Sequence, residues 1–558
     1  MKVYDAVASA LAEEQCDVLF GVMGDGNMSL WGALGRDARV ALVSARNEAG
    51  AVAMADGYSR GTGKLGVATI TCGPGLTQIG TSLISAARNR SPIVIVIGEI
   101  PKDSPNGLQR MDQRRFVEAC EARFQPVTSA ENLAAEMAEA FYAARTHRVP
   151  VVLNIPNDIY EKTLEWEFDY KPSHIFATPA SAAPRADDVA ALADRLAAAR
   201  HPVILAGAGA RSPAAKEAML RLADRVGALL GTSLKAKGLF AGETYDLGIC
   251  GTFSAAPAEH LLAQADFVLA VGAEVGYYTS EGGFAFPTAD IARIDIKPAP
   301  ETIGFLPGLY VRGDAQETVE ALDRALDKRG FRQQGARTAD TRKILQAPAG
   351  DFEAATDGID PRKLCTALGA LLPQGCLVTC GAAHFFSFPI MYLALPKGGE
   401  ITFSYALGAV GQTLPIAIGI GVGNPGRPHV LIEGDGSLLM NIQELDTAAR
   451  SGIPLVVIVW NDAGYGAEVH KLRAKGFDPT LAQWKSADFA TVARGFGGDG
   501  VRVDTLAELE PAMERGLACG KLFVIDVRVS PSVLSDPYEK LHFGMPNRAP
   551  LLRPLAAS

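Results

Sequence analysis

Short apolar runs alternate with amphipathic segments along almost the whole chain, and this alternation limits the folds that are open to it. The apolar runs have the length of strands, and each lies next to a segment with helical spacing of its apolar residues. In the first third of the chain, such runs cover residues 18–22, 39–44, 64–71, 92–98 and 150–155. Strands that alternate with helices form parallel sheets covered by helices. The sequence therefore predicts an α/β protein built from doubly wound parallel sheets.

Two stretches rich in proline, alanine and polar residues interrupt the alternation. We interpret residues 169–185 and 331–354 as linkers, because their apolar residues show only weak periodicity. A chain of 558 residues is long enough for several domains of common size. The linkers divide it into three predicted doubly wound parallel-sheet domains, at residues 1–168, 186–330 and 355–545.

Charge and composition argue against several classes of function. The chain has 53 Lys and Arg against 62 Asp and Glu, a net charge of −9 and no basic cluster, so we expect no nucleic-acid partner. No apolar run reaches the length of a membrane span, and the first residues lack the pattern of a secretory signal. We therefore expect a cytoplasmic protein without a membrane partner. The eight cysteines lack zinc-site spacing and are expected to be reduced thiols.

A glycine-rich turn in the third predicted domain carries the strongest chemical signal. Gly434-Asp435-Gly436-Ser437 follows one apolar strand, and the next predicted strand leads to Asp462. Because adjacent parallel strands end at the same edge of a sheet, both carboxylates can reach one point. Mg²⁺ suits that point, since it binds one or two carboxylates together with water and substrate phosphates, and the glycines let backbone N–H groups approach a diphosphate. Taken alone, the turn also fits an ordinary connection between a strand and a helix.

The joint pattern of this turn, one helix, one strand and the second turn at residues 461–466 is more specific. It resembles the cofactor-binding motif of enzymes that depend on thiamine diphosphate (ThDP). The resemblance implies that Asp435, Asp462 and the carbonyl of Gly464 bind Mg²⁺. It also implies cofactor contacts from the neighbouring residues Gly436, Ser437, Tyr465 and Gly466. Most members of the family have asparagine where Asp462 stands, so this chain brings an additional negative charge to the metal.

A second pattern lies in the first predicted domain and centres on Glu48. Glu48 follows a strand and begins a helical run, after which come another strand and the turn at residues 73–78. On its own, Glu48 fits an acidic residue in the first turn of a helix, where the helix dipole stabilises it. The order of the segments resembles the pyrimidine-binding domain of ThDP enzymes, which implies that Glu48 is the catalytic carboxylate. The other cofactor-binding positions that the resemblance implies here are Gly24, Asn27, Pro74 and Gln78.

The segment from Tyr405 to Gly419 is similar to the one that lies under the cofactor's rings in the same enzymes. The resemblance implies that Gly408 offers its carbonyl to the aminopyrimidine and that Val410 supports the bent form of ThDP. His384 falls where acetolactate synthases have a histidine beside the diphosphate. A lone histidine fits a structural role equally well.

The middle predicted domain contains an incomplete dinucleotide motif at residues 207–212, which is weak evidence by itself. In ThDP enzymes the corresponding domain holds FAD, ADP or no nucleotide. All three possibilities stay open for this chain.

The patterns follow one another in the order of the acetolactate synthase and 2-keto acid decarboxylase group, which implies pyrimidine-binding, middle Rossmann-like and diphosphate-binding domains. The implied function is ThDP- and Mg²⁺-dependent cleavage or formation of a C–C bond on small-molecule 2-keto acid or aldehyde substrates. We predict Gln113, Glu468 and His470 as substrate-pocket residues, although the last two equally fit a solvated helix face. The lack of histidine between residues 73 and 124 argues against a dedicated pyruvate decarboxylase, since those enzymes carry adjacent histidines there.

Three alternatives stay open: a 2-keto acid decarboxylase that releases an aldehyde, a 2-hydroxyacyl-CoA lyase, and a ThDP-binding regulatory protein without turnover. The presence of Glu48 and Asp435 argues against the last of these. In the resembling families, one cofactor lies between the first domain of one chain and the third domain of another. The resemblance therefore implies a homodimer or homotetramer.

Overall fold

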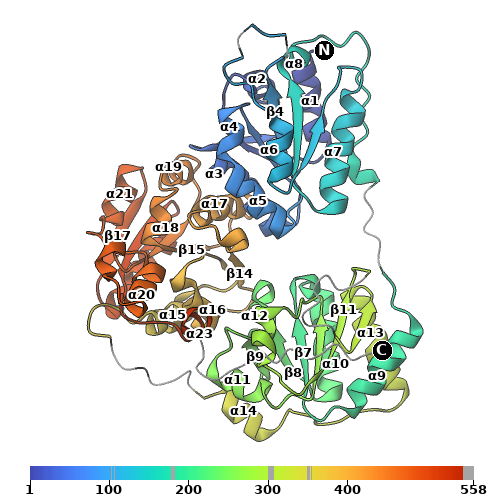
Figure 1. Cartoon of the computed structure of the whole chain (residues 1–558), viewed down its shortest axis with the longest axis vertical. Helices are drawn as coiled ribbons and strands as arrows, with labels where there is room; N and C mark the ends of the chain where they lie inside the picture. Colours follow the sequence, from blue (N-terminus) through green and yellow to red (C-terminus); the bar gives the residue numbers. More distant parts are fainter. Residues whose placement is uncertain are drawn as a thin grey trace.

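The structure, a computed structural model, describes residues 1–101, 103–105, 107–176, 182–298, 307–347, 352 and 355–543. These residues form three units, each built on a six-stranded sheet with every strand pair parallel. Figure 1 shows the first unit at the top in blue, the third below it on the left in orange, and the middle unit at the lower right in green. Helices cover both faces of the sheets. The predicted α/β class with three doubly wound parallel sheets is confirmed.

The first unit has the strand order β2-β1-β3-β4-β6-β5. Its strands are β1 (Val18–Gly21), β2 (Ala41–Ser44), β3 (Gly66–Ile70), β4 (Ile93–Glu99), β5 (Arg123–Pro126) and β6 (Val151–Pro156). Its helices are α1 (Val3–Glu13), α2 (Met28–Leu34), α3 (Glu48–Thr62), α4 (Pro74–Gln78), α5 (Gly80–Asn89), α6 (Gln113–Ala119), α7 (Leu133–His147) and α8 (Asn157–Tyr160). The central strand β3 is buried along its whole length, as expected for a parallel strand between two helical layers.

The middle unit has the strand order β12-β11-β10-β7-β8-β9. Its strands are β7 (Pro202–Ala206), β8 (Leu229–Thr232), β9 (Asp246–Ile249), β10 (Phe267–Val271), β11 (Asp290–Asp295) and β12 (Leu309–Arg312). Its helices, short 3₁₀ turns included, are α9 (Ala186–Ala198), η2 (Ala208–Ala210), α10 (Pro213–Val226), η3 (Leu234–Ala236), α11 (Ala256–Leu262), α12 (Tyr277–Ser280), η4 (Glu281–Gly283), α13 (Ala315–Lys328) and α14 (Ala339–Leu345).

The third unit has the strand order β14-β13-β15-β16-β18-β17. Its strands are β13 (Leu377–Cys380), β14 (Glu400–Phe403), β15 (His429–Gly434), β16 (Val456–Asn461), β17 (Asp499–Val503) and β18 (Phe523–Arg528). Its helices are α15 (Pro361–Leu371), η5 (His384–Phe386), α16 (Ser387–Tyr392), η6 (Ala406–Gly408), α17 (Thr413–Gly423), α18 (Asp435–Leu439), α19 (Glu444–Arg450), α20 (Gly466–Ala474), η7 (Pro479–Ala482), α21 (Phe489–Gly495), η8 (Leu506–Glu508), α22 (Leu509–Ala518) and α23 (Asp536–His542). Every residue of β15 and β16 is buried.

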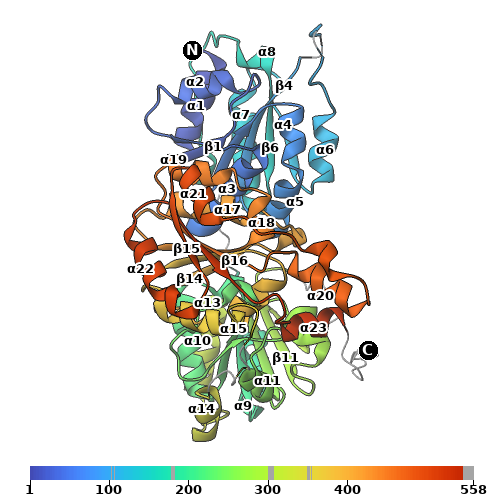
Figure 2. The same ribbon diagram turned by 90° about the vertical axis from the view of Figure 1, so that its left-hand side faces the viewer.

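Helices α3 and α17 join the first and third units, and Figures 1 and 2 both show them side by side. A Cβ at Gly57 would lie 2.1 Å from the carbonyl oxygen of Ile416, and one at Gly419 would lie 1.9 Å from that of Met54. Only glycine allows the two backbones to approach this closely. One cluster of buried apolar side chains therefore continues from the first sheet to the third.

The two predicted linkers contain ordered structure where they are described. The first includes the short turn η1 (Ser173–Ile175), whose Ser173 N–H and hydroxyl donate to the buried Glu14 carboxylate of the first unit. The second contains α14. Residues 177–181 and 348–354, except Phe352, and the end of the third predicted domain at 544–545 lie outside the described residues. Within the described part of the chain, no helix combines the length and apolarity that crossing a membrane requires.

Candidate active site

Three neighbouring strands of the third unit end at one edge of the sheet and carry its predicted site residues there. β13, β15 and β16 are adjacent, with Cys380 paired to Ile432 and Gly434 paired to Trp460. His384 lies just after β13, Asp435 starts the helix after β15, and Asp462 directly follows β16. The parallel topology therefore brings residues from distant parts of the sequence together, as expected where ligands bind to α/β sheets.

The Asp435 and Asp462 carboxylates lie close together in this buried edge. Asp435 is 1% exposed, and its Oδ2 has no hydrogen-bond partner among the described residues. Burial is the main cause that raises the pKa of Asp435, and the charge of Asp462 raises it further. Burial also raises the pKa of Asp462. Two adjacent carboxylates, one buried and one half-buried, fit a divalent cation. The described residues contain no group of three or more His, Cys, Asp or Glu side chains arranged to hold a metal.

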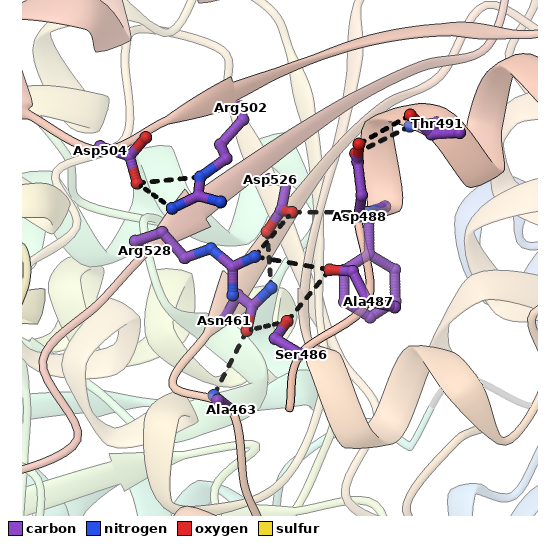
Figure 3. Close-up of polar contacts among 11 residues, drawn as sticks. Asn461, Ala463, Ser486, Ala487, Asp488, Thr491, Arg502, Asp504, Asp526 and Arg528 are labelled. Atoms are coloured by element: carbon purple, nitrogen blue, oxygen red, sulfur yellow. Dashed lines mark hydrogen bonds and ion pairs between the residues drawn. The ribbon is translucent and has the colours of Figure 1, made fainter. Parts of the chain in front are cut away.

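A polar network holds the turn that carries Asp462, and the sequence interpretation did not include it. The buried Asn461 donates to Asp526 at 2.7 Å and accepts from the Ala463 N–H at 3.3 Å and the Ser486 hydroxyl at 2.9 Å, as Figure 3 shows. Arg528 pairs with the same Asp526 at 3.5 Å. An asparagine at the end of a fully buried strand was the available signal, because a buried amide needs several partners.

The GDGS turn is joined to the segment that precedes α17. The Ser437 hydroxyl accepts from the Gly411 N–H at 3.0 Å, and the Asn441 amide donates to the Gly411 carbonyl. Leu407 has a positive φ of 63°, which is unusual for leucine, and Gly408 has a φ of 70°. Gly408 is exposed and Val410 is half-buried. The predicted ring-binding segment is thus held in one conformation by the predicted diphosphate turn.

Tyr465 and Trp484 cover the GDGS turn. Their rings are 4.7 Å apart, and a Cβ at Gly436 would lie 2.8 Å from the Tyr465 ring. At Gly466, a Cβ would lie 2.4 Å from Asp462 Oδ2 and 3.7 Å from His384 Nδ1. Both glycines are therefore needed for the close packing of these groups.

His384 is buried beneath the C-terminal helix α23. Its Nε2 accepts a hydrogen bond from the Ser535 N–H at 3.2 Å, and the rings of His470 and Tyr538 lie 4.6 Å and 5.0 Å from its own. Burial, and next the charge of His470, lowers the pKa of His384 to about 3. The neutral ring accepts at Nε2, so its proton lies on Nδ1, the nitrogen nearer to Gly466.

The two substrate-pocket predictions on α20 have different environments. His470 is 6% exposed and packs against His384, and burial lowers its pKa to about 4. Glu468 is exposed and lies 3.8 Å from Lys471. His470 therefore lies behind His384, whereas Glu468 is accessible.

The predicted residues of the first unit gather at the carboxyl ends of its strands. Asn27 is buried, and its side chain accepts from the Gly24 N–H at 2.8 Å and donates to the Val22 carbonyl at 3.0 Å. Pro74 and Gln78, at the two ends of α4, are exposed. Asn27 thus shapes its turn, whereas Pro74 and Gln78 face outward.

Gln113 is buried, and both the oxygen and the nitrogen of its side-chain amide make hydrogen bonds. Its oxygen accepts from the Gly73 N–H at 3.2 Å, and its nitrogen donates to the Gly98 carbonyl at 3.0 Å and to Asn154 at 2.6 Å. These contacts hold the Gly73 turn in place. They give Gln113 a structural function whether or not a substrate also approaches it.

The carboxylate of Glu48 is half-buried and makes no hydrogen bond or ion pair with any of the residues the structure describes. Its Oε1 lies 3.4 Å from the position of a Cβ at Gly75. The Ser82 hydroxyl lies 2.8 Å from the carbonyl oxygen of Ala49 and 2.6 Å from Gln412 Oε1. The first turn of α3 therefore lies beside the segment that contains Val410.

Glu433, which precedes the GDGS turn, is a further residue that the sequence interpretation missed. It is fully buried, its Oε2 has no partner among the described residues, and burial raises its pKa to about 7. A Cβ at Gly381 would lie 2.2 Å from its Oε1. An acidic residue inside an otherwise apolar strand was the available signal.

The incomplete dinucleotide motif of the middle unit is explained by backbone packing. A Cβ at Gly207 would lie 2.2 Å from the Gly272 carbonyl oxygen, and one at Gly209 would lie 3.1 Å from Gly272 Cα. A cavity of about 160 Å³ lies instead at the other end of β7, where His201 and Val203 line it. The described contacts therefore give no support for a nucleotide at residues 207–212.

Three family models match the chain in the order of the three units. Residues 1–116 match the N-terminal TPP binding domain of thiamine pyrophosphate enzymes, residues 189–322 their central domain, and residues 386–527 their C-terminal TPP binding domain. These ranges include the turns that carry Glu48, Asp435 and Asp462.

Individual relatives match nearly the whole chain. A probable 2-ketoarginine decarboxylase of Pseudomonas aeruginosa is 29% identical over 534 residues, which cover 94% of this chain and 93% of the relative. The acetolactate synthase large subunit of Haemophilus influenzae is 26% identical over 542 residues, covering 95% and 94%. The acetolactate synthase isozyme 2 large subunit of Escherichia coli is 28% identical over 537 residues, covering 94% of each chain.

Proposed function

Because the chain belongs to the thiamine pyrophosphate enzyme family, we propose that it is a ThDP- and Mg²⁺-dependent enzyme that cleaves or forms the C–C bond next to the carbonyl of a 2-keto acid. The observation that carries this proposal is the pair of adjacent carboxylates at the ends of neighbouring parallel strands, the buried Asp435 and the half-buried Asp462. A cation bound to a diphosphate would compensate both charges.

The residues of the third unit fit the cofactor in kind and in place. Asp435, Asp462 and the Gly464 carbonyl would hold the metal. The N–H groups of Gly436 and Ser437, at the start of α18, would bind the diphosphate, and the Nδ1–H of His384 would donate to it. Toward the rings, Gly408 would offer its carbonyl and Val410 its apolar surface, with Tyr465 and Gly466 closing the turn beside the metal.

When bound, ThDP supplies a nucleophilic carbon and accepts the electron pair that is released as CO₂ leaves a 2-keto acid. The chain's own contribution is a carboxylate that can hold a proton at N1′ of the aminopyrimidine. Glu48 fits this task, because it is half-buried and has no competing partner among the described residues. Helix α23 covers His384, and the Tyr465 ring packs against Gly436 beside the proposed metal turn.

Two reactions, carboligation and decarboxylation alone, are compatible with these residues, and the names of the relatives include both. Several relatives are named acetolactate synthase, which favours joining of two carbonyl compounds, and one is named a probable 2-ketoarginine decarboxylase, which favours decarboxylation. The first unit has no histidine between residues 73 and 124, where dedicated pyruvate decarboxylases carry a pair. We therefore favour carboligation, with decarboxylation alone as the second candidate.

A substrate panel tests this proposal. The holoenzyme, loaded with ThDP and Mg²⁺, is incubated with 2-keto acids of different size and charge, each alone and together with an acceptor aldehyde or a second 2-keto acid. We expect CO₂ release and, with an acceptor, a product whose mass equals the sum of the two substrates minus CO₂. Release of CO₂ with only an aldehyde product would favour the decarboxylase. A ThDP-loaded protein that neither cleaves nor joins any substrate would contradict the proposed activity.

We further propose that a second copy of the chain completes the site. Large apolar side chains are exposed beside both sets of cofactor-binding residues. Met23 and Met28 flank the Gly24 turn with 56% and 52% exposure, and Leu439 and Met440 follow the GDGS turn with 42% and 48%. Apolar surface at such positions is typical of an interface between chains. A dimer with two sites, or a pair of such dimers, would cover it.

A further inference from the structure

The loop that leads into Glu48 is held by a helix of the third unit. Glu444, at the start of α19, is fully buried, and its Oε1 accepts hydrogen bonds from the backbone N–H groups of Arg46 and Asn47 at 3.1 Å and 3.0 Å. The Thr447 hydroxyl donates to its other oxygen at 2.7 Å. Both oxygens of Glu444 are thus bound by donors of the same chain.

Other contacts extend this attachment along the loop. Arg450, at the end of α19, donates to the Ser44 carbonyl at 2.6 Å, and the Arg46 side chain pairs with Asp446 at 2.5 Å. At Gly50 a Cβ would lie 2.5 Å from Glu444 Oε1, so the carboxylate also packs against the first turn of α3. The backbone before Glu48 is therefore hydrogen-bonded to α19, and the backbone after it packs against the same helix.

A short stretch of chain connects this attachment to the predicted metal turn. Asp435 begins α18, Asn441 follows and binds the Gly411 carbonyl, and the Glu444 N–H donates to the Asn441 carbonyl at 3.0 Å. The segment of residues 435–450 thus begins in the predicted metal turn and contacts both the ring-binding segment and the loop before Glu48.

We propose that Glu444 is a positioning residue for Glu48, which sets the backbone of the proton-transfer group relative to the third unit. The inference rests on the proposed function, since it assigns Glu444 a part in the same reaction. Glu48 itself keeps a carboxylate without a partner among the described residues, so its backbone is held while its side chain stays available to a ligand. Glu444 and Glu48 belong to one chain, so the contact is made whether the cofactor lies on the third unit of that chain or on that of a second copy.

Geometry explains why such an attachment matters. A proton-transfer group works only within hydrogen-bond distance of its target, and a misplacement of about 1 Å can cost about 100-fold in rate. Replacing Glu444 by alanine leaves the N–H groups of Arg46 and Asn47 without an acceptor and opens space beside Gly50. Glutamine keeps one oxygen for both N–H groups. We therefore expect a large effect of Glu444→Ala and a small one of Glu444→Gln.

Two measurements test the proposal. In the protein without cofactor, amide hydrogen exchange followed by mass spectrometry reports on the N–H groups of Arg46 and Asn47. In the protein loaded with ThDP and Mg²⁺, exchange of the C2 proton of the bound cofactor reports on the proton-transfer step. The variants are Glu444→Ala, Glu444→Gln and, as a matched control, Asn424→Ala. Asn424 directly follows α17, and this change removes its hydrogen bond to the Gly61 carbonyl at the far end of α3.

For Glu444→Ala we expect faster amide exchange in the peptide that contains residues 44–49, C2 exchange slowed by about 10-fold to 100-fold, and little change in ThDP affinity. Glu444→Gln should restore most of both rates, and Asn424→Ala should change neither. The positioning role would be overturned if Asn424→Ala slowed C2 exchange as much as Glu444→Ala does. It would also be overturned if Glu444→Ala lost ThDP binding while its amide exchange stayed unchanged.

Glu48→Gln separates this inference from the proposed function. If Glu48→Gln abolishes C2 exchange while Glu444→Ala leaves it unchanged, the positioning role is wrong and the proposed function stands. If Glu48→Gln itself exchanges at the normal rate, the role of Glu48 in the proposed function fails. Should Glu444→Ala not fold, Gly50→Ala serves instead, because its Cβ displaces the Glu444 carboxylate while alanine favours the helix. It should slow C2 exchange in the same way, and an unchanged rate would count against the proposal.

Discussion

Glu48 combines partial burial with the absence of any charged or hydrogen-bonded partner among the described residues, which suits a group that must exchange a proton with a ligand. We predict that Glu48→Gln folds and binds ThDP but loses C2 deprotonation, because an amide cannot hold the proton at N1′. General acid–base groups contribute about 10²-fold to 10⁴-fold to a rate. Exchange of the C2 proton with deuterium measures the loss, and a near-normal rate would show that another group does this work.

The raised pKa values of the adjacent Asp435 and Asp462 make stability depend on pH. Their raised pKa values mean that the folded state holds protons more tightly than the unfolded state, so the pair destabilises the fold increasingly as the pH rises above the usual carboxyl pKa of about 4. In the proposed function Mg²⁺ would bind the ionised pair, and protons would compete with it. We therefore predict that Mg²⁺ with ThDP raises Tm more at about pH 8 than at about pH 6.

Thermal unfolding at the two pH values, with and without Mg²⁺, measures this difference. Asp435→Asn is the control, because it keeps the shape of the side chain and removes one charge of the pair. It should lose most of the Mg²⁺-dependent increase in Tm at either pH. An increase that is equal at both pH values in the unaltered protein would argue against a metal at this pair.

Asp462 is the position where most ThDP enzymes are expected to have asparagine. We predict that Asp462→Asn retains Mg²⁺-dependent ThDP binding and turnover, since the amide oxygen can still bind the metal and the Asn461 network that holds the turn is untouched. Calorimetry of ThDP binding and the rate with the best substrate of the panel measure the outcome. An inactive Asp462→Asn protein would show that the second charge is required.

The C-terminal helix α23 covers His384 and ties the third unit to the middle one. Lys540 on this helix pairs with Glu259 at 2.5 Å and with Glu281 at 3.1 Å, both in the middle unit. The Ser535 N–H just before the helix sets which nitrogen of His384 carries the proton. A helix from the end of the chain thus controls a side chain that follows β13.

We predict that Ser535→Pro weakens ThDP binding several-fold, because it removes that N–H, and a hydrogen bond of this kind is worth about 1 kcal/mol. Ser535 has a φ of −84°, close to the value that proline requires. Ser535→Ala is the matched control, since it keeps the N–H and removes only a hydroxyl that has no partner among the described residues. Calorimetry compares the two, and equal affinities would mean that the N–H does not act through His384.

Assembly determines whether one chain can form a complete site. Helices α3 and α17 bind the first and third units of one chain together, while apolar side chains beside both sets of site residues stay exposed. We predict that inactive Glu48→Gln and inactive Asp435→Ala chains recover activity when their subunits exchange. A mixed dimer would have one intact site and one with both changes, and so at most about half the activity of the unaltered dimer.

Sedimentation of the mixture must show that subunits have exchanged before the result is interpreted. Each variant alone, treated in the same way, is the control and should stay inactive. No recovery after demonstrated exchange, or full activity of a monomer at the assay concentration, would contradict a site shared between chains.

The sequence by itself determined the local features of this protein. Apolar runs of strand length, next to segments of helical period, were sufficient to predict three parallel α/β sheets, because burial of a strand on both faces requires a continuous apolar stretch. The glycine-rich turns after the strands could also be predicted from the sequence, because their glycines and acidic residues stand next to one another in the chain. Asp435 and Asp462 were expected to meet for that reason, and the structure brings them together.

Only the tertiary structure decided which distant groups support those turns. Glu444 with the loop before Glu48, Ser535 with His384, and Asn461 with Asp526 are contacts between residues far apart in the sequence. No local pattern tells which residue is the partner in each contact, because the pairing depends on how whole helices and sheets pack. The close crossing of α3 and α17, which two glycines allow, places α19 against the first unit, and no short segment of the chain contains that information.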